Sequence, residues 1–115
     1  MSQRVNQKSI VVLVSGNGSN LQAILDDIAL QKINGAVSAV IANKATAYGL
    51  TRAKNAGIPA IHIDHKSFSS REEYDANMAE CIDEFAPDLI VLAGFMRILT
   101  PSFVEHYQGK MLNIH

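Results

Sequence analysis

Short apolar runs alternate with helical patterns along almost the whole chain, and this alternation limits the possible folds more than any other feature. Five runs are predicted to be strands: residues 9–14, 36–42, 60–63, 88–93 and 110–114. Continuous apolar runs are typical of strands that are buried on both faces of a parallel sheet. Strands that alternate with helices predict an α/β fold with helices on both faces of that sheet.

The segments between these runs carry the spacing of amphipathic helices. Two apolar stripes recur at helical intervals: Leu21, Ile24, Leu25 and Ile28 in the first, and Tyr74, Met78, Cys81, Ile82 and Phe85 in the second. The second stripe predicts a helix over residues 70–85, where Ser70 and Glu73 fit a capping box and Pro87 ends the helix. Shorter helices are predicted at residues 47–56, with Gly57 as left-handed cap, and from Pro101 to Gly109.

The longest helix lies between the third and fourth strands, which suits a crossing back over the sheet. We therefore expect the strand order 3-2-1-4-5 of a doubly wound, Rossmann-like parallel sheet. Ligands of such sheets bind outside the carboxyl ends of the strands where the order reverses. Residues 15–20 and 94–99 follow the first and fourth strands, so they are the candidate binding loops.

Composition excludes several classes of protein. The 115 residues allow one domain, which we divide into a flexible leader at 1–8 and a folded part at 9–115. A net charge of −1 argues against a nucleic-acid or anionic-membrane partner. Cys81 is the only cysteine, which excludes an intrachain disulfide and favours a cytoplasmic location. The N-terminus shows no signal-peptide pattern, and no apolar run is long enough to span a bilayer.

Residues 15–20, with the sequence Ser-Gly-Asn-Gly-Ser-Asn, join the first strand to the first helix. Glycines let backbone N–H groups turn toward a ligand, and a helix start offers unpaired donors and a positive dipole end. Gly18, Ser19 and Asn20 therefore form a candidate phosphate site. The alternative is a plain turn in which Ser19 or Asn20 caps the helix. Leu21 stands where a dinucleotide fingerprint needs its third glycine.

The loop at residues 94–99 is apolar, which is unusual for a loop. Its large apolar side chains are Phe95, Met96, Ile98 and Leu99. So short a segment cannot direct all four side chains into one core. One interpretation is a pocket for a flat, apolar ligand, with Arg97 available to an acidic group. The other is packing beneath the following helix, and the sequence alone leaves both open.

Asn113 and His115 end the fifth strand, where alternation puts them on one side and Ile114 on the other. Asn can donate a hydrogen bond to a developing oxyanion, and His can donate one or move a proton. The pair could therefore serve acyl transfer; the alternative is a terminal His without a function.

No metal site is expected. His62, Asp64 and His65 have ligand-like spacing, but on a strand His65 does not share the face of the other two, and no further cluster completes a site.

Taken together, the motifs resemble the phosphoribosylglycinamide formyltransferase family of purine synthesis. The resemblance covers residues 9–115 and rests on IVVLVSGNGSNLQAI, PDLIVLAGFMRIL, the Ser-Arg-Glu at residues 70–72 and the closing LNIH. It implies transfer of a formyl group from the co-substrate 10-formyltetrahydrofolate to the amine of glycinamide ribonucleotide. The implied reaction passes through a tetrahedral intermediate and needs no metal.

The resemblance also implies roles for single residues. Those that hold the ribonucleotide phosphate are Gly18, Ser19 and Asn20, and those that offer backbone contacts to the substrate are Ala93 and Gly94. The folate pocket is lined by Met96, Arg97, Ile98, Leu99 and Val104. Asn113 and His115 match two members of a catalytic trio, whose third member, an aspartate, lies beyond residue 115 in the family pattern.

The chain is accordingly expected to be the N-terminal, nucleotide-binding part of a truncated formyltransferase fold and to be inactive alone. One alternative is another folate-dependent formyltransferase or a formyltetrahydrofolate hydrolase. A different alternative is a non-catalytic module that binds phosphate or a mononucleotide. Expected partners are small molecules, and the open edge of the fifth strand makes a homodimer possible.

Overall fold

Five strands form one sheet in the order β3-β2-β1-β4-β5 in the computed structural model, which describes residues 7–114. The strands are β1 (Lys8–Val14), β2 (Gly35–Ala42), β3 (Ala60–His62), β4 (Leu89–Ala93) and β5 (Met111–Ile114). All neighbouring strands pair in parallel, so the predicted α/β class and strand order are confirmed. Residues 1–6, most of the expected leader, and His115 lie outside the described residues.

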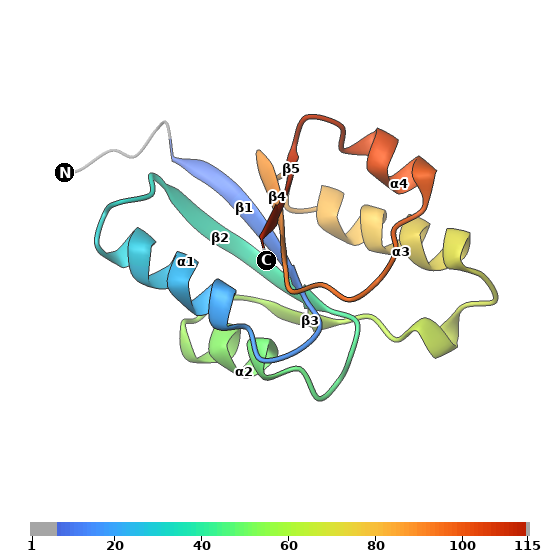
Figure 1. Cartoon of the computed structure of the whole chain (residues 1–115), viewed down its shortest axis with the longest axis horizontal. Coiled ribbons are helices and arrows are strands. Elements are labelled where there is room, and N and C mark those ends of the chain that lie inside the picture. The colour runs from blue at the N-terminus through green and yellow to red at the C-terminus, as the bar shows by residue number, and fades with distance from the viewer. Residues whose placement is uncertain (1–6, 115) are drawn as a thin grey trace.

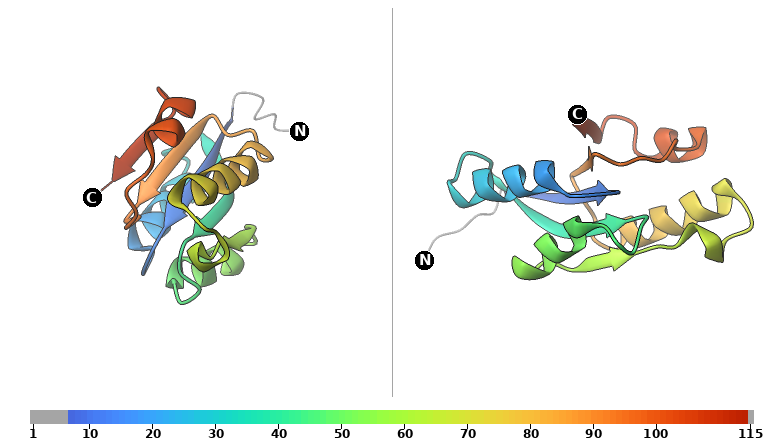
Figure 2. Two further views of the ribbon diagram at one scale, coloured as in Figure 1. Left: turned by 90° about the vertical axis from the view of Figure 1, so that its right-hand side faces the viewer. Right: turned by 60° about the horizontal axis from the view of Figure 1, so that its bottom comes forward.

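Helices cover both faces of this sheet. They are α1 (Ser19–Ala29), α2 (Tyr48–Asn55), α3 (Arg71–Asp83) and α4 (Pro101–His106), with a short 3-10 turn, η1 (His65–Ser67), before α3. The helices α1 and α2 lie on one face, and α3 and α4 lie on the other (Figures 1 and 2). None of the helices within residues 7–114 is long and apolar enough to cross a membrane.

Alternation along β1 divides the core into two layers. Ile10, Val12 and Val14 face α1 and α2, whereas Val11 and Leu13 face α3 and α4. These five side chains are almost completely buried, because β1 is the central strand and has a partner strand on each side. The stripe predicted for α1 lies on the first layer, and that of α3 lies on the second.

Two helix ends differ from the sequence-based expectation. Helix α3 ends at Asp83, because Ala86 adopts a left-handed conformation with φ 45° before Pro87 is reached. The predicted capping box at its start is only half formed. Ser70 accepts from the Glu73 N–H as expected, but the Glu73 carboxylate accepts from Ser69 rather than from the backbone of Ser70. Helix α4 ends at His106, shorter than predicted.

Candidate functional site

The carboxyl ends of β1 and β4 are joined through one buried hydroxyl. Ser15, the residue after β1, donates to Asn43 Oδ1 at 2.7 Å and accepts from the backbone N–H of Met96 at 2.7 Å. Ser15 and Asn43 are both buried. The loops after β1, β2 and β4 are thus fixed to one another at the point where the strand order reverses.

The loop at residues 15–20 leads into α1 without a side-chain cap. Gly18 is the N-cap of α1, with φ 80° and no side-chain cap hydrogen bond. The alternative in which Ser19 or Asn20 caps the helix is therefore wrong. The first intrahelical bond runs from Gln22 N–H to Gly18 O, so the N–H groups before it have no partner of their own within the helix. No acidic residue lies in this first turn to oppose an anion.

A side chain at Gly18 would not fit. A Cβ there would lie 2.7 Å from the Cα of Gly49, the second residue of α2. The glycine is needed both for its left-handed backbone and for this close approach of the loop to α2.

The apolar loop after β4 divides its side chains between core and solvent. Phe95 and Leu99 pack against the second core layer, whereas Met96 and Ile98 are 77% and 80% exposed. Packing against the core therefore holds for Phe95 and Leu99, and the interpretation as a ligand pocket stays a prediction. Half of the apolar side chains pack inward, and the other half are exposed to solvent. An apolar surface of this kind suits a flat ligand.

Arg97 is turned inward and is not available to an acidic ligand through its guanidinium. Its guanidinium carbon lies 4.0 Å from the centre of the Tyr74 ring, and its Nη2 lies 3.6 Å from Asp75 Oδ1. The second oxygen of Asp75 accepts from the Thr100 N–H at 2.8 Å. The acidic group that Arg97 meets thus belongs to this chain, and Asp75 fixes the end of the loop.

Sequence reasoning missed Asp75. A carboxylate in the middle of a predicted amphipathic helix is normally assigned to solvent, yet this one is almost completely buried beside Tyr74. The Tyr74 hydroxyl donates to Ile63 O at 2.8 Å, and burial raises the pKa of Tyr74 to about 12.

Strand β5 brings Asn113 to the same edge of the sheet. Asn113 is exposed and pairs in register with Leu92, while Ile114 pairs with Ala93 and packs against the first core layer. The expected opposition of Asn113 and Ile114 is present, and His115 lies outside the described residues. Gly94 follows Ala93 in a left-handed conformation with φ 70° and is exposed. Val104 is 43% exposed on α4.

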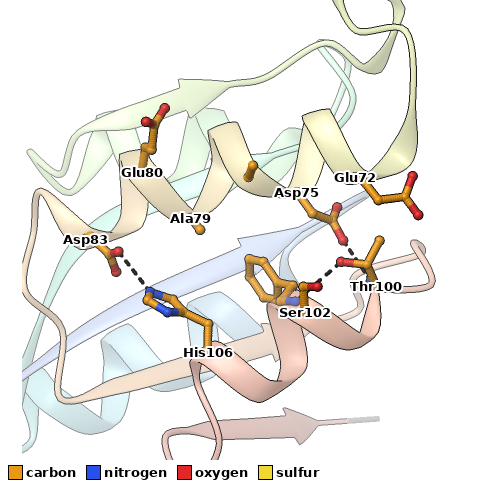
Figure 3. Close-up of a pocket in the computed structure, with 10 residues that line it drawn as sticks. Glu72, Asp75, Ala79, Glu80, Asp83, Thr100, Ser102 and His106 are labelled. Carbon is orange, nitrogen blue, oxygen red and sulfur yellow. Dashed lines mark hydrogen bonds and ion pairs between the residues drawn. The ribbon is translucent and has the colours of Figure 1, made fainter.

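A groove lies elsewhere, between α3 and α4, and Figure 3 shows its lining. Its volume is about 460 Å³, and its lining contains none of the residues predicted for the site. His106 Nε2 lies 3.0 Å from Asp83 Oδ2 at one end of this groove. Partial burial alone would raise the pKa of Asp83, but hydrogen bonds from Tyr107 and His106 hold it below the usual value.

Within residues 7–114, no group of three or more His, Cys, Asp or Glu side chains could hold a metal ion.

Comparisons with known proteins connect this geometry to one family. The formyl transferase family matches residues 8–115. Phosphoribosylglycinamide formyltransferase of Escherichia coli K12 is 58% identical over 107 residues, which cover 93% of this chain and 50% of the relative. The human trifunctional purine biosynthetic protein adenosine-3 is 46% identical over 106 residues, which cover 92% of this chain and 10% of that protein.

Solved structures of formyltransferases also resemble this chain. Phosphoribosylglycinamide formyltransferase of Coxiella burnetii in complex with CHES superimposes with a TM-score of 0.89 at 52% identity, covering 95% of this chain and 51% of that one. Glycinamide ribonucleotide transformylase 1 of Symbiobacterium toebii gives 0.91 at 43% identity. The chain spans about half the length of the bacterial relatives it matches.

Proposed function

This chain belongs to the formyl transferase family, and from that premise we propose that it serves formyl transfer from 10-formyltetrahydrofolate to the amine of glycinamide ribonucleotide in purine synthesis. We propose that residues 9–115 form the nucleotide-binding, N-terminal part of a formyltransferase fold. The observation that carries the proposal is the meeting of three features at one edge of the sheet. These are the uncapped start of α1, the exposed apolar side chains after β4, and Asn113 at the end of β5.

The ribonucleotide phosphate binds at Gly18, Ser19 and Asn20. Backbone N–H groups at the start of α1 donate to the phosphate oxygens, and the positive end of the helix dipole adds to the attraction. Support comes from the absence of a side-chain cap and of first-turn acids. The glycinamide end extends past Ala93 and Gly94, where the exposed, left-handed Gly94 leaves the backbone open to a substrate.

The folate binds against the loop after β4. Met96 and Ile98 offer the apolar contacts for its flat ring system, Val104 continues this wall, and Leu99 supports it from the core side. Arg97 belongs to the pocket through its backbone, because its guanidinium is held by Tyr74 and Asp75.

The reaction is a direct acyl transfer. The substrate amine attacks the formyl carbon, the carbonyl electron pair moves to oxygen, and a tetrahedral intermediate forms. Collapse of the intermediate re-forms the carbonyl and breaks the bond to the folate nitrogen, which takes up the proton that the amine gives away. Asn113 and protonated His115 donate hydrogen bonds to the oxyanion, and one such donor contributes about 3 kcal/mol.

We place the reaction in the cytoplasm, with small-molecule partners only. A homodimer through the edge of β5 stays a prediction. The phosphate-binding geometry at α1 favours a ribonucleotide substrate over those of the other folate-dependent enzymes. A non-catalytic phosphate-binding module has the same geometry at α1 but no need for Asn113.

A chimera tests this proposal. Residues 1–115 are joined to the half of the Escherichia coli relative that this chain does not match, and formation of the formylated ribonucleotide is followed by mass spectrometry. The chimera is expected to turn over, and Asn113→Ala is expected to lower its kcat about 100- to 1,000-fold. A folded chimera that binds the ribonucleotide without turnover supports the non-catalytic module instead. The separate 115-residue chain is expected to be inactive.

A further inference from the structure

One arginine of helix α2, Arg52, binds the candidate phosphate loop through hydrogen bonds. Arg52 Nε donates to Asn17 O at 2.8 Å, and Arg52 Nη2 donates to Asn17 Oδ1 at 2.7 Å. The remaining nitrogen, Nη1, donates to Gln22 Oε1 in α1 at 3.2 Å. We propose that Arg52 is a positioning residue for the phosphate-binding loop, an inference that rests on the proposed function.

Further contacts seat the same loop on α2. The Gly49 N–H donates to Gly16 O at 3.1 Å, and Gly18 approaches Gly49 too closely for a side chain. The helices α1 and α2 lie side by side on this face of the sheet (Figure 1). The loop is therefore held from one side along its length, and Arg52 supplies two side-chain hydrogen bonds to Asn17.

Asn17 connects Arg52 to the start of α1. It is exposed and directly precedes Gly18, whose left-handed backbone turns the chain into α1. The orientation of the peptide between Asn17 and Gly18 sets where the first N–H groups of α1 point. Because no side chain caps the helix, these groups depend on the loop for their direction. Holding Asn17 at two oxygens removes backbone freedom that phosphate binding would otherwise have to remove.

Arg52 acts through the loop rather than on the phosphate. Three of its five N–H groups, one on each nitrogen, already donate to oxygens of this chain, and its guanidinium carbon lies 4.9 Å from the centre of the Tyr48 ring. A planar fork can engage two oxygens of one residue at once, whereas the single ammonium of a lysine cannot reproduce this geometry. The positive charge alone is thus insufficient for the role.

Binding of inorganic phosphate to the 115-residue chain, measured by calorimetry, separates position from charge. Arg52→Lys keeps the charge and loses the fork, whereas Lys54→Gln removes an equal charge from the exposed side of the same helix. We expect Arg52→Lys to weaken binding about 5-fold or more and Lys54→Gln to change it less than about 2-fold. Equal weakening by both variants, or no effect of Arg52→Lys, overturns the proposal.

A second readout keeps the inference independent of phosphate affinity. If the unaltered chain binds no phosphate at millimolar concentration, the phosphate site of the proposed function is disproved. Amide hydrogen exchange then tests separately whether Arg52 positions the loop. We expect exchange at Gln22 and Gly49, whose N–H groups donate to the loop carbonyls of Gly18 and Gly16, to accelerate about 10-fold in Arg52→Lys, with no change in Lys54→Gln. Unchanged exchange in Arg52→Lys shows that the arginine does not position the loop.

In a double-mutant cycle, Asn17→Ala and Arg52→Lys should not be additive in phosphate affinity, because both remove the same contact. Additive effects would show that Arg52 does not act on the loop through Asn17.

Discussion

The Ser15 hydroxyl lies 2.7 Å from the backbone nitrogen of Met96, and this contact joins the two loops that the proposed function assigns to different substrates. The same hydroxyl donates to Asn43, so its proton and a lone pair are both used inside the protein. A buried hydroxyl with both partners in place fixes its neighbours strongly, because loss of the hydroxyl leaves buried polar groups unpaired. The relative position of the two loops is therefore built into the end of the sheet.

Ser15→Ala is expected to destabilise the chain by about 1–3 kcal/mol, since it leaves Asn43 Oδ1 and the Met96 N–H without their partner. Chemical denaturation measures this loss, and hydrogen exchange at Met96 should accelerate. Ser102→Ala, at an exposed position of α4, is the matched control and should stay within about 0.5 kcal/mol of the parent. Equal effects of the two variants would show that the Ser15 contacts contribute nothing special.

Gly18→Ala tests the close approach of the loop to α2. Gly18 and Gly57 have similar left-handed backbones, with φ 80° and 74°, but a Cβ at Gly57 meets no atom within 4 Å. Gly57→Ala should therefore cost about 1 kcal/mol from backbone strain alone. Gly18→Ala should cost at least about 1 kcal/mol more, because its Cβ also collides with Gly49. Thermal and chemical unfolding compare the two variants, and equal losses argue against the contact.

Asp75→Asn removes the charge that faces Arg97 while it leaves an oxygen for the Thr100 N–H. We expect a loss of about 3 kcal/mol, because a buried guanidinium then has no opposite charge. Glu80→Gln neutralises an exposed carboxylate of the same helix and should change the free energy of unfolding by less than about 0.5 kcal/mol. A loss below about 1 kcal/mol for Asp75→Asn would mean that the pair is solvated.

Deprotonation of Tyr74 should lower the free energy of unfolding at alkaline pH. Its pKa is about 12 in the folded chain and near 10 when unfolded, so the folded chain holds the proton more tightly between these values. The stabilisation is complete below pH 10 and is lost as pH rises toward 12, by up to about 2 kcal/mol. Tyr74→Phe lacks this titration, and its unfolding free energy should decline less steeply over that window. Parallel pH profiles for the two proteins would contradict the account.

Strand order and the position of the candidate loops were predictable because they follow from local patterns. Apolar runs and helical stripes are legible along the chain, and the rule for ligand sites in doubly wound sheets needs only the strand order. The orientation of Arg97 was not predictable in this way. It depends on Asp75, which lies 22 positions earlier and reaches the loop only after α3 has packed on the sheet.

The hydrogen bonds between Arg52 and Asn17 were likewise not predictable from local sequence patterns. The two residues are 35 positions apart, and although Asn17 lies in the loop motif after β1, Arg52 belongs to no apolar stripe or recognisable motif. Contacts between separate helices and loops depend on how the first core layer sets α2 beside α1. Sequence periodicity identifies which face of a helix is buried, but it does not identify which polar side chain at the border of that face reaches a neighbouring loop.

The most direct test of the central claim is a titration of the 15N-labelled chain with glycinamide ribonucleotide, followed residue by residue by NMR. We predict the largest amide shifts at Gly18, Ser19 and Asn20, with smaller ones at Gly94 and Asn113. Ala79 and Phe103, which line the groove between α3 and α4, should not shift. Shifts confined to that groove, or none at millimolar ribonucleotide in the folded chain, would contradict the assignment of the site to the carboxyl end of the sheet.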